Sequence, residues 1–267
     1  MLTAIFQYSF MVRGLEAGVI VALIAPLIGI FLVLKRYSLI ADTLAHVSLA
    51  GIAIGLLFGI NPVLTALGTT TTASLGIERL RSSNKVYGES ALALFLSGSL
   101  ATAVVILSLA HGFNSNLFNY LFGSIVTVTT NDVYIISLLA VVVISVLVFF
   151  YKELVYITFD EEAAKVSGVP TGKINSILIV LAALTVSLAI PIVGVLLIAA
   201  LIVIPVITAL QLRKGFFKTI VYAQIISLFS VVLGIIASFF LNLSTGGTIV
   251  LTMLAIFIVI FSIKQRR

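Results

Sequence analysis

The chain has 267 residues, of which 61% are hydrophobic and 9% are charged, and its formal net charge is +6. This composition excludes a soluble globular domain and predicts a chain that crosses the lipid bilayer several times. Residues 1–267 form one expected transmembrane domain, and because the sequence has no GxxxxGKS/T run, a partner must supply any ATP-driven work. Cysteine is absent, which excludes thiolate metal ligands.

Basic residues gather at a few places along the chain. Fourteen of the fifteen Lys and Arg residues fall in five short clusters, and only Arg13 stands apart. The clusters are Lys35-Arg36, Arg79/Arg81/Lys85, Lys152/Lys165/Lys173, Arg213/Lys214/Lys218 and Lys264/Arg266/Arg267. Because translocating basic residues is costly, they collect on the cytoplasmic side, and each cluster marks a return of the chain to the cytoplasm. The net charge is thereby explained, and we expect no nucleic-acid partner.

Apolar segments of about 20 residues predict the membrane-spanning helices of the first half. In chain order these segments are 11–34, 38–60, 63–80, 90–110 and 133–151, and they run alternately inward and outward from an external N-terminus. At the outer end of the first, we expect Arg13 to pair with Glu16, one turn away. Residues 111–131 are amphipathic and broken by Gly123, which predicts an external loop with a short re-entrant or interfacial piece.

The second half begins with residues 152–173, the longest predicted cytoplasmic loop. Residues 174–210 are too long for one pass and predict two short passes that turn near Pro191–Gly194. The last hairpin is formed by segments 219–241 and 248–263. The expected fold is therefore an all-α polytopic membrane protein of about eight to nine transmembrane helices with broken segments, and its C-terminus is inside.

Two side chains of the second span are candidates for chemistry. Asp42 and His46 stand at i and i+4, so they project from one face of a helix. They lie roughly 9 and 15 Å past Arg36, near the middle of a ~30 Å hydrocarbon core, where a carboxylate is costly and usually functional. A carboxylate and an imidazole on adjacent turns supply half of a tetrahedral divalent-metal site. The alternatives are a buried Asp–His hydrogen bond and an Asp42–Arg36 ion pair.

The cytoplasmic loop contains a second informative segment, Phe159–Pro170. Three consecutive acids, Asp160–Glu162, suit the positive N-terminal end of a short helix, and Gly168 with Pro170 indicates its end. Such a helix between two spans is well placed to dock a soluble partner. A solvated connector is the alternative.

Several segments resemble the ABC-3 family of metal-ion ABC permeases, and they occur in the family's order. They are Lys35–Gly55, Tyr120–Asp132, Phe159–Pro170, Val193–Leu210 and Leu243–Leu251. The most specific part is the run D-T-L-A-H-x-S-L-A-G at residues 42–51, and the chain is more similar to zinc-uptake permeases than to manganese or iron ones. It departs from the family at Ala41, where Gly is common, and at Gly246-Gly247, where Gly-Pro is common. Neither change removes a ligand.

The resemblance implies the permease subunit of a type II ABC importer in the bacterial cytoplasmic membrane. Its implied partners are a second copy of the chain, two cytoplasmic ATP-binding subunits and an extracytoplasmic metal-binding protein. The subunit would be a transporter and not an enzyme, with no permanently bound cofactor, and its cargo would be a divalent ion, zinc or alternatively manganese or iron. Asp42 and His46 match the family's metal-coordinating pair. The residues that match the ATPase-docking loop are Phe159, Asp160, Glu161, Glu162, Ala163 and Gly168.

An ion-coupled secondary transporter is the main rival, with Asp42 as its protonated site. Such carriers usually show internal repeats and paired broken helices, and this sequence shows one broken segment. A channel is disfavoured because no polar pore-lining helix recurs, and a membrane enzyme because no nucleophile–base set is present.

Overall fold

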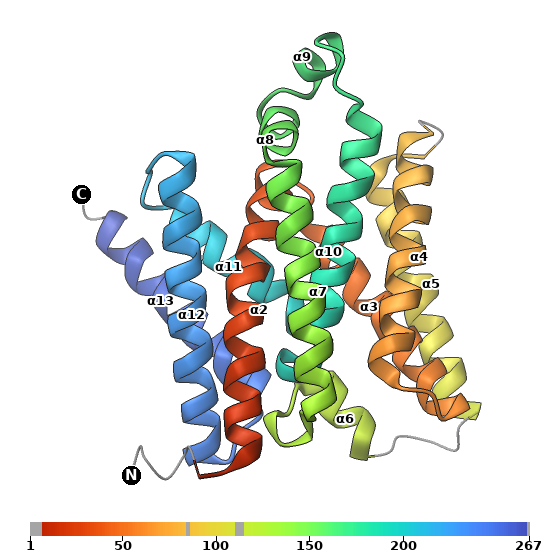
Figure 1. The fold of residues 1–267 in the computed structure, drawn as a ribbon, viewed down its shortest axis with the longest axis vertical. Coiled ribbons are helices and arrows are strands. Elements are labelled where there is room, and N and C mark those ends of the chain that lie inside the picture. Colours follow the sequence, from red (N-terminus) through yellow and green to blue (C-terminus); the bar gives the residue numbers. More distant parts are fainter. Residues whose placement is uncertain (1–6, 84–85, 110–114, 266–267) are drawn as a thin grey trace.

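All regular elements in the described part of the chain are helices (Figure 1). The structure is a computed structural model that describes residues 7–83, 86–109 and 115–265. The long helices are α2 (Ser9–Leu34), α3 (Ser38–Phe58), α4 (Pro62–Ser82), α5 (Gly88–Leu109), α7 (Thr130–Phe149), α10 (Thr171–Val193), α12 (Phe216–Leu241) and α13 (Thr245–Gln265). The shorter elements are α6 (Ser115–Phe122), the 3-10 helix η1 (Ile125–Thr127), α8 (Tyr151–Phe159), α9 (Glu161–Val166) and α11 (Ile198–Leu210). The predicted all-α fold is confirmed.

Within the described ranges, 7 helices are long and apolar enough to cross a membrane. They are α2, α3, α5, α7, α10, α12 and α13. The sequence counted α4 and α11 as passes too. α4 has 21 residues but is rich in threonine, and α11, with 13 residues, reaches only about 20 Å.

The helices run back and forth between two ends of the molecule, and Figure 1 places the start of α2 at one end and the last turn of α13 toward the other. The helix ends that carry the basic clusters gather at that second end, the upper one in the view, together with α8 and α9. This is the arrangement that the clusters predicted for the cytoplasmic side. His111, expected at the external end of a helix, lies outside the described residues.

The 174–210 stretch does turn where the sequence indicated, but its two parts are unequal. α10 begins at Thr171, runs through Pro191 and ends at Val193, which gives it 23 residues and the length of a full span. Gly194 follows with φ 81°, a backbone conformation that favours glycine, and α11 begins at Ile198. The expectation of two short passes was wrong for the first pass, because the apolar run of α10 is continued upstream by helical residues of the predicted loop.

Three segments that are distant in the sequence meet beside this turn. Backbone hydrogen bonds join residues 120–124 to residues 191–196, among them one from the Val195 amide to the Tyr120 carbonyl at 2.9 Å. The chains approach so closely that a Cβ atom on Gly123 would overlap the Ile192 carbonyl, and one on Gly246 would overlap the Val193 carbonyl. The break predicted at Gly123 is confirmed, since α6 ends at Phe122, and its cause is this contact.

The expected pairing of Arg13 with Glu16 is wrong. Arg13 Nε donates a hydrogen bond of 2.9 Å to the carbonyl oxygen of Val128, just after η1, and Glu16 is exposed. A carbonyl at a chain turn has no helical partner, so it takes the guanidinium as its donor.

The core is centred on α2, α3 and α10, which are mostly buried, whereas α5, α7 and α13 present apolar side chains outward. An exposed apolar surface of this kind suits contact with lipid. α3 therefore lies among the mostly buried helices. One face of α3, here called its open face, is less covered by the rest of the chain, and the candidate site lies on it.

Candidate functional site

The small residues of α3 serve to bring it against α4. A Cβ atom on Gly51 would overlap the Thr69 hydroxyl, and one on Gly55 would overlap the Thr65 hydroxyl. Small residues at these two positions allow the two helices to pack closely. The contact fixes the rotation of α3 and so decides which of its faces remains open.

Asp42 and His46 lie on that open face. The Asp42 side chain is 44% exposed and the His46 side chain 19% exposed. Counted from Ser38, they stand roughly 6 and 12 Å along a helix of about 31 Å. Both therefore lie in the half of α3 that follows Lys35-Arg36.

The two side chains approach each other without forming a hydrogen bond. His46 Nε2 is 3.9 Å from Asp42 Oδ1, which is beyond the usual hydrogen-bond range. Two ligands that each lie 2.0–2.1 Å from one tetrahedral ion are separated by about 3.3 Å, so a small rotation of either side chain would suffice to share an ion. Arg36 is exposed and forms no ion pair with Asp42 among the described residues.

The second ring nitrogen of His46, Nδ1, is buried and also has no hydrogen-bond partner within the described chain. Among the described residues, no group of three or more His, Cys, Asp and Glu side chains lies close enough to hold a metal ion. One copy of the chain thus offers a pair of metal-binding groups.

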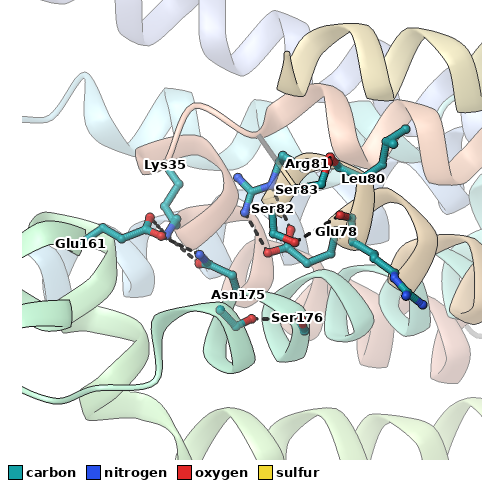
Figure 2. Close-up of polar contacts among 11 residues, drawn as sticks. Lys35, Glu78, Leu80, Arg81, Ser82, Ser83, Glu161, Asn175 and Ser176 are labelled. Atoms are coloured by element: carbon teal, nitrogen blue, oxygen red, sulfur yellow. Dashed lines mark hydrogen bonds and ion pairs between the residues drawn. The ribbon is translucent and has the colours of Figure 1, made fainter. Parts of the chain in front are cut away.

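The predicted docking segment, Phe159–Pro170, is joined to the long helices by a buried lysine (Figure 2). Lys35, directly after α2, donates to Glu161 Oε2 at 2.8 Å and to Asn175 Oδ1 at 2.8 Å. The amide of Asn175 in turn donates to Glu161 Oε1 at 2.7 Å. These three residues, here called the lysine cluster, join the end of α2 to α9 and α10, and the Lys35 side chain is only 3% exposed.

Burial and charge set the protonation of this cluster. Desolvation lowers the pKa of the Lys35 ammonium, against the opposing effect of the Glu161 carboxylate. Burial by itself raises the pKa of Glu161, but the hydrogen bond and charge of Lys35, together with the Asn175 amide, outweigh it, and the carboxyl pKa lies below its ordinary value. Glu161 is therefore ionised at neutral pH.

A second ion pair lies beside the lysine cluster. Arg81, on α4, donates to both carboxylate oxygens of Glu78, at 2.9 and 3.1 Å, and the Glu78 side chain is buried (Figure 2). The Arg81 guanidinium also lies over the Tyr37 ring, 4.2 Å from its centroid. Tyr37 precedes α3, so these contacts hold the start of α3 against the end of α4.

The remaining residues of the predicted docking segment mostly face outward. Asp160 caps α9 by accepting a hydrogen bond from the Ala163 amide at 2.9 Å, and Glu162 is exposed. Phe159 is 64% exposed and packs one edge against Phe216 of α12, with ring centroids 5.6 Å apart. The segment ends at Gly168, whose φ of 85° favours glycine.

Sequence reasoning missed the roles of Lys35 and Asn175. It treated Lys35 as a marker of topology and did not consider Asn175, although an amide near the start of an apolar helix is a signal of a buried polar contact. It also overlooked Glu78, which lies within a predicted span.

Known proteins match nearly the whole chain. The ABC 3 transport family matches residues 7–264. A probable metal transport system membrane protein of Treponema pallidum (strain Nichols) is 38% identical over 97% of this chain and 97% of its own length. The manganese transport system membrane protein MntC of Listeria monocytogenes is 30% identical, covering 97% of this chain and 92% of the relative. The high-affinity zinc uptake system membrane protein ZnuB of Haemophilus influenzae is 28% identical, covering 97% and 100%.

A solved structure shares the fold. It is PsaBC from Streptococcus pneumoniae in complex with Fab, with a TM-score of 0.87 and 26% sequence identity. The match covers 98% of this chain and 95% of that one.

Proposed function

Since the chain belongs to the ABC 3 transport family and is a metal-ion ABC transporter permease, we propose that its cargo is zinc and that Asp42 and His46 bind the ion inside the membrane. The observation that carries the proposal is the geometry of this pair. The two side chains lie one turn apart on the open face of α3, with ligand atoms 3.9 Å apart and no hydrogen bond between them.

The choice of zinc rests on ligand chemistry and on resemblance. A mixed set of imidazole nitrogen and carboxylate oxygen suits zinc, which is usually four-coordinate. Manganese and iron accept the same donors, so they are the alternative cargo. The relatives named above include both a zinc and a manganese system. Their identities to this chain, 30% for the manganese system and 28% for the zinc system, do not separate the two metals. The resemblance of the chain's sequence to zinc-uptake permeases favours zinc.

Two copies of the chain would complete the coordination. One copy supplies two ligands, and the exposed carboxylate of Asp42 lies on a surface that a second copy can cover. In a symmetric dimer with the two α3 helices near the axis, two carboxylates and two imidazoles would meet one ion.

We propose that partner proteins supply the energy for metal transport. Residues 1–267 would form one permease domain in the cytoplasmic membrane, without enzymatic activity of its own. Two ATP-binding subunits would dock at the loop 152–173, through the residues Phe159, Asp160, Glu161, Glu162, Ala163 and Gly168, and an extracytoplasmic protein would deliver the ion. ATP binding and hydrolysis would then shift the permease between outward and inward access.

The test is uptake by the complete complex in proteoliposomes loaded with ATP. We expect zinc uptake that requires both ATP and the binding protein, and that an equal concentration of manganese or iron inhibits weakly. Stronger uptake of manganese or iron would overturn the choice of zinc. Uptake that follows a proton or sodium gradient and needs no ATP would instead support the secondary transporter.

A further inference from the structure

The corner between α2 and α3 is a rigid piece of backbone. Residues 35–37 connect the two helices, and their amides bond back to the last turn of α2; the Tyr37 amide donates to the Leu32 carbonyl at 2.7 Å. Arg36 adopts φ 60°, which closes the corner tightly. A displacement of this corner is therefore passed on to the start of α3, the helix that carries Asp42 and His46.

The lysine cluster is the side-chain contact between this corner and α9. A lysine that is almost fully buried needs strong partners, because an unpaired ammonium in such a place is costly. Glu161 and Asn175 supply them at 2.8 Å each, and the Ile157 carbonyl adds a longer contact at 3.4 Å. Since these partners come from α8, α9 and α10, Lys35 cannot follow one of them without disturbing the others.

The other side of the corner is held as well. Tyr37 lies under the Arg81 guanidinium, and Arg81 is fixed by the buried Glu78 on α4. α4 is the helix against which Gly51 and Gly55 of α3 pack. The corner, α3 and α4 therefore form one body, and Lys35 connects this body to the docking segment (Figure 2).

We propose that Lys35 is a positioning residue that links α9 to α3, so that a movement of the docked ATPase at α9 is transmitted through the Lys35–Glu161–Asn175 cluster to the metal-binding pair. This inference rests on the proposed function, in which α9 docks the ATPase and Asp42 and His46 bind the ion. It assigns to Glu161 a role inside the permease beside its place in the docking loop, since 42% of its side chain stays exposed.

If the lysine cluster only stabilised the fold, its loss would affect transport only through stability. A double substitution distinguishes this structural role from the proposed link. Glu161→Gln alone leaves the buried Lys35 ammonium without its carboxylate and should lower stability, whereas Lys35→Met leaves a Glu161 carboxylate that is 42% exposed and should lower it less. In Lys35→Met/Glu161→Gln no charge remains unpaired, and the amide introduced in place of the Glu161 carboxylate can still bond Asn175. We expect the melting temperature of this double variant to recover, because replacing both partners of a buried pair is often close to neutral. The link to α2, however, stays broken.

The experiment uses the complete complex in proteoliposomes and measures zinc ions moved per ATP hydrolysed. In the double variant we expect this ratio to fall about tenfold while assembly and ATP hydrolysis continue. The charge-reversed variant Lys35→Glu/Glu161→Lys should regain most of the ratio, because the Asn175 amide can flip and serve both groups in the new order. Lys214→Met, which removes an exposed lysine outside the loop 152–173, is the control and should keep the wild-type ratio.

The outcomes distinguish this link from the proposed function. A double variant with wild-type stability and a wild-type transport ratio overturns the link, whatever the single variants do. A ratio that falls only in step with the melting temperature across all variants also overturns it, because that is the behaviour of a structural pair. If the wild-type complex hydrolyses ATP but moves no metal ion, the proposed function fails, and the link fails with it.

Discussion

Two ionisable side chains near the α2–α3 corner are held in opposite ways. Lys35 is almost fully buried and has three hydrogen-bond acceptors, whereas Asp42 is half-exposed and stands beside His46 without bonding to it. Burying a charge is costly, so a charge enclosed by the fold is paired within it. A carboxylate and an imidazole left apart on an open face are instead available to a ligand. At the residue scale, the fold thus separates a structural charge from the candidate binding pair.

We predict that Asp42→Asn and His46→Ala each reduce zinc uptake at least about tenfold, because loss of a metal ligand should cost no less than loss of a group that merely supports one. Assembly with the ATPase should be unchanged, since neither side chain forms a hydrogen bond within the described chain. The control is Thr43→Val, because among the described residues the Thr43 hydroxyl bonds only the Leu39 carbonyl of the same helix. Wild-type uptake by both variants, measured in proteoliposomes, would rule out the pair as the metal site.

The lowered pKa of Glu161 predicts a pH dependence of stability. The ordinary carboxyl value is 4.5, and Lys35, Asn175 and Arg81 together hold the folded value below it. A group with a lowered folded pKa stabilises the fold above its ordinary value, and this contribution is lost as the pH falls through the folded pKa. The melting temperature of the purified protein should therefore drop below pH 4.5 more steeply than that of Glu161→Gln. Parallel curves for the two proteins would contradict the prediction.

The residues of the site differed in how visible they were in the sequence. Asp42 and His46 could be predicted because depth and helical spacing are read directly from a single span. The lysine cluster could not, since Lys35 meets Glu161 and Asn175 only after helices separated by more than a hundred residues have packed together. The sequence correctly indicated a short helix that starts at the acids 160–162, but it did not show that Asp160 caps this helix or that Glu161 bonds Lys35 and Asn175.

At the element scale, hydropathy located the helices but did not fix their lengths. α4 is a regular helix of 21 residues although it is rich in threonine, because hydroxyls such as that of Thr70 bond carbonyls of their own helix. α10 is longer than expected because its first turn includes residues that composition assigned to a loop. The meeting of Gly123, Gly194 and Gly246 also depends on tertiary packing, and the sequence indicated only a local break at Gly123.

The close approach of Gly246 to Val193 predicts that Gly246→Ala lowers the stability of the fold. The added Cβ would overlap the Val193 carbonyl, and relief of such a contact requires backbone shifts that typically cost about 1–3 kcal/mol. The matched control is Gly98→Ala on α5, where the added Cβ meets nothing and alanine should be slightly stabilising in a helix. Thermal unfolding of the purified variants measures both. A Gly246→Ala variant as stable as Gly98→Ala would show that the crossing can relax.

At the scale of the whole molecule, one copy presents three different surfaces. The outer faces of α5, α7 and α13 are apolar and suit lipid. The open face of α3 presents Asp42 and His46, the proposed metal-binding pair, and the end with the basic clusters presents α9 and the exposed Phe159. Each surface suits a different binding partner, as expected for a subunit of a larger membrane complex. The basic clusters predicted from charge alone that these helix ends lie together at one end of the molecule. The three surfaces could be identified only from the folded structure.

Phe159 is the proposed aromatic anchor for an ATP-binding subunit. Phe159 has one edge on Phe216 and most of its ring exposed, so it can be covered by an ATP-binding subunit, and buried aromatic contacts usually dominate the energy of an interface. Phe159→Ala should therefore reduce co-purification of that subunit more than neutralisation of either Asp160 or Glu162. Because the native chain has no cysteine, single cysteines at positions 159 and 163 should cross-link to the ATPase without background from other permease thiols. A cysteine at the exposed position 214, outside the loop 152–173, is the control for free access. If positions 159 and 163 reacted as readily as position 214 with a bulky aqueous thiol reagent in the assembled complex, this segment would not be the docking surface.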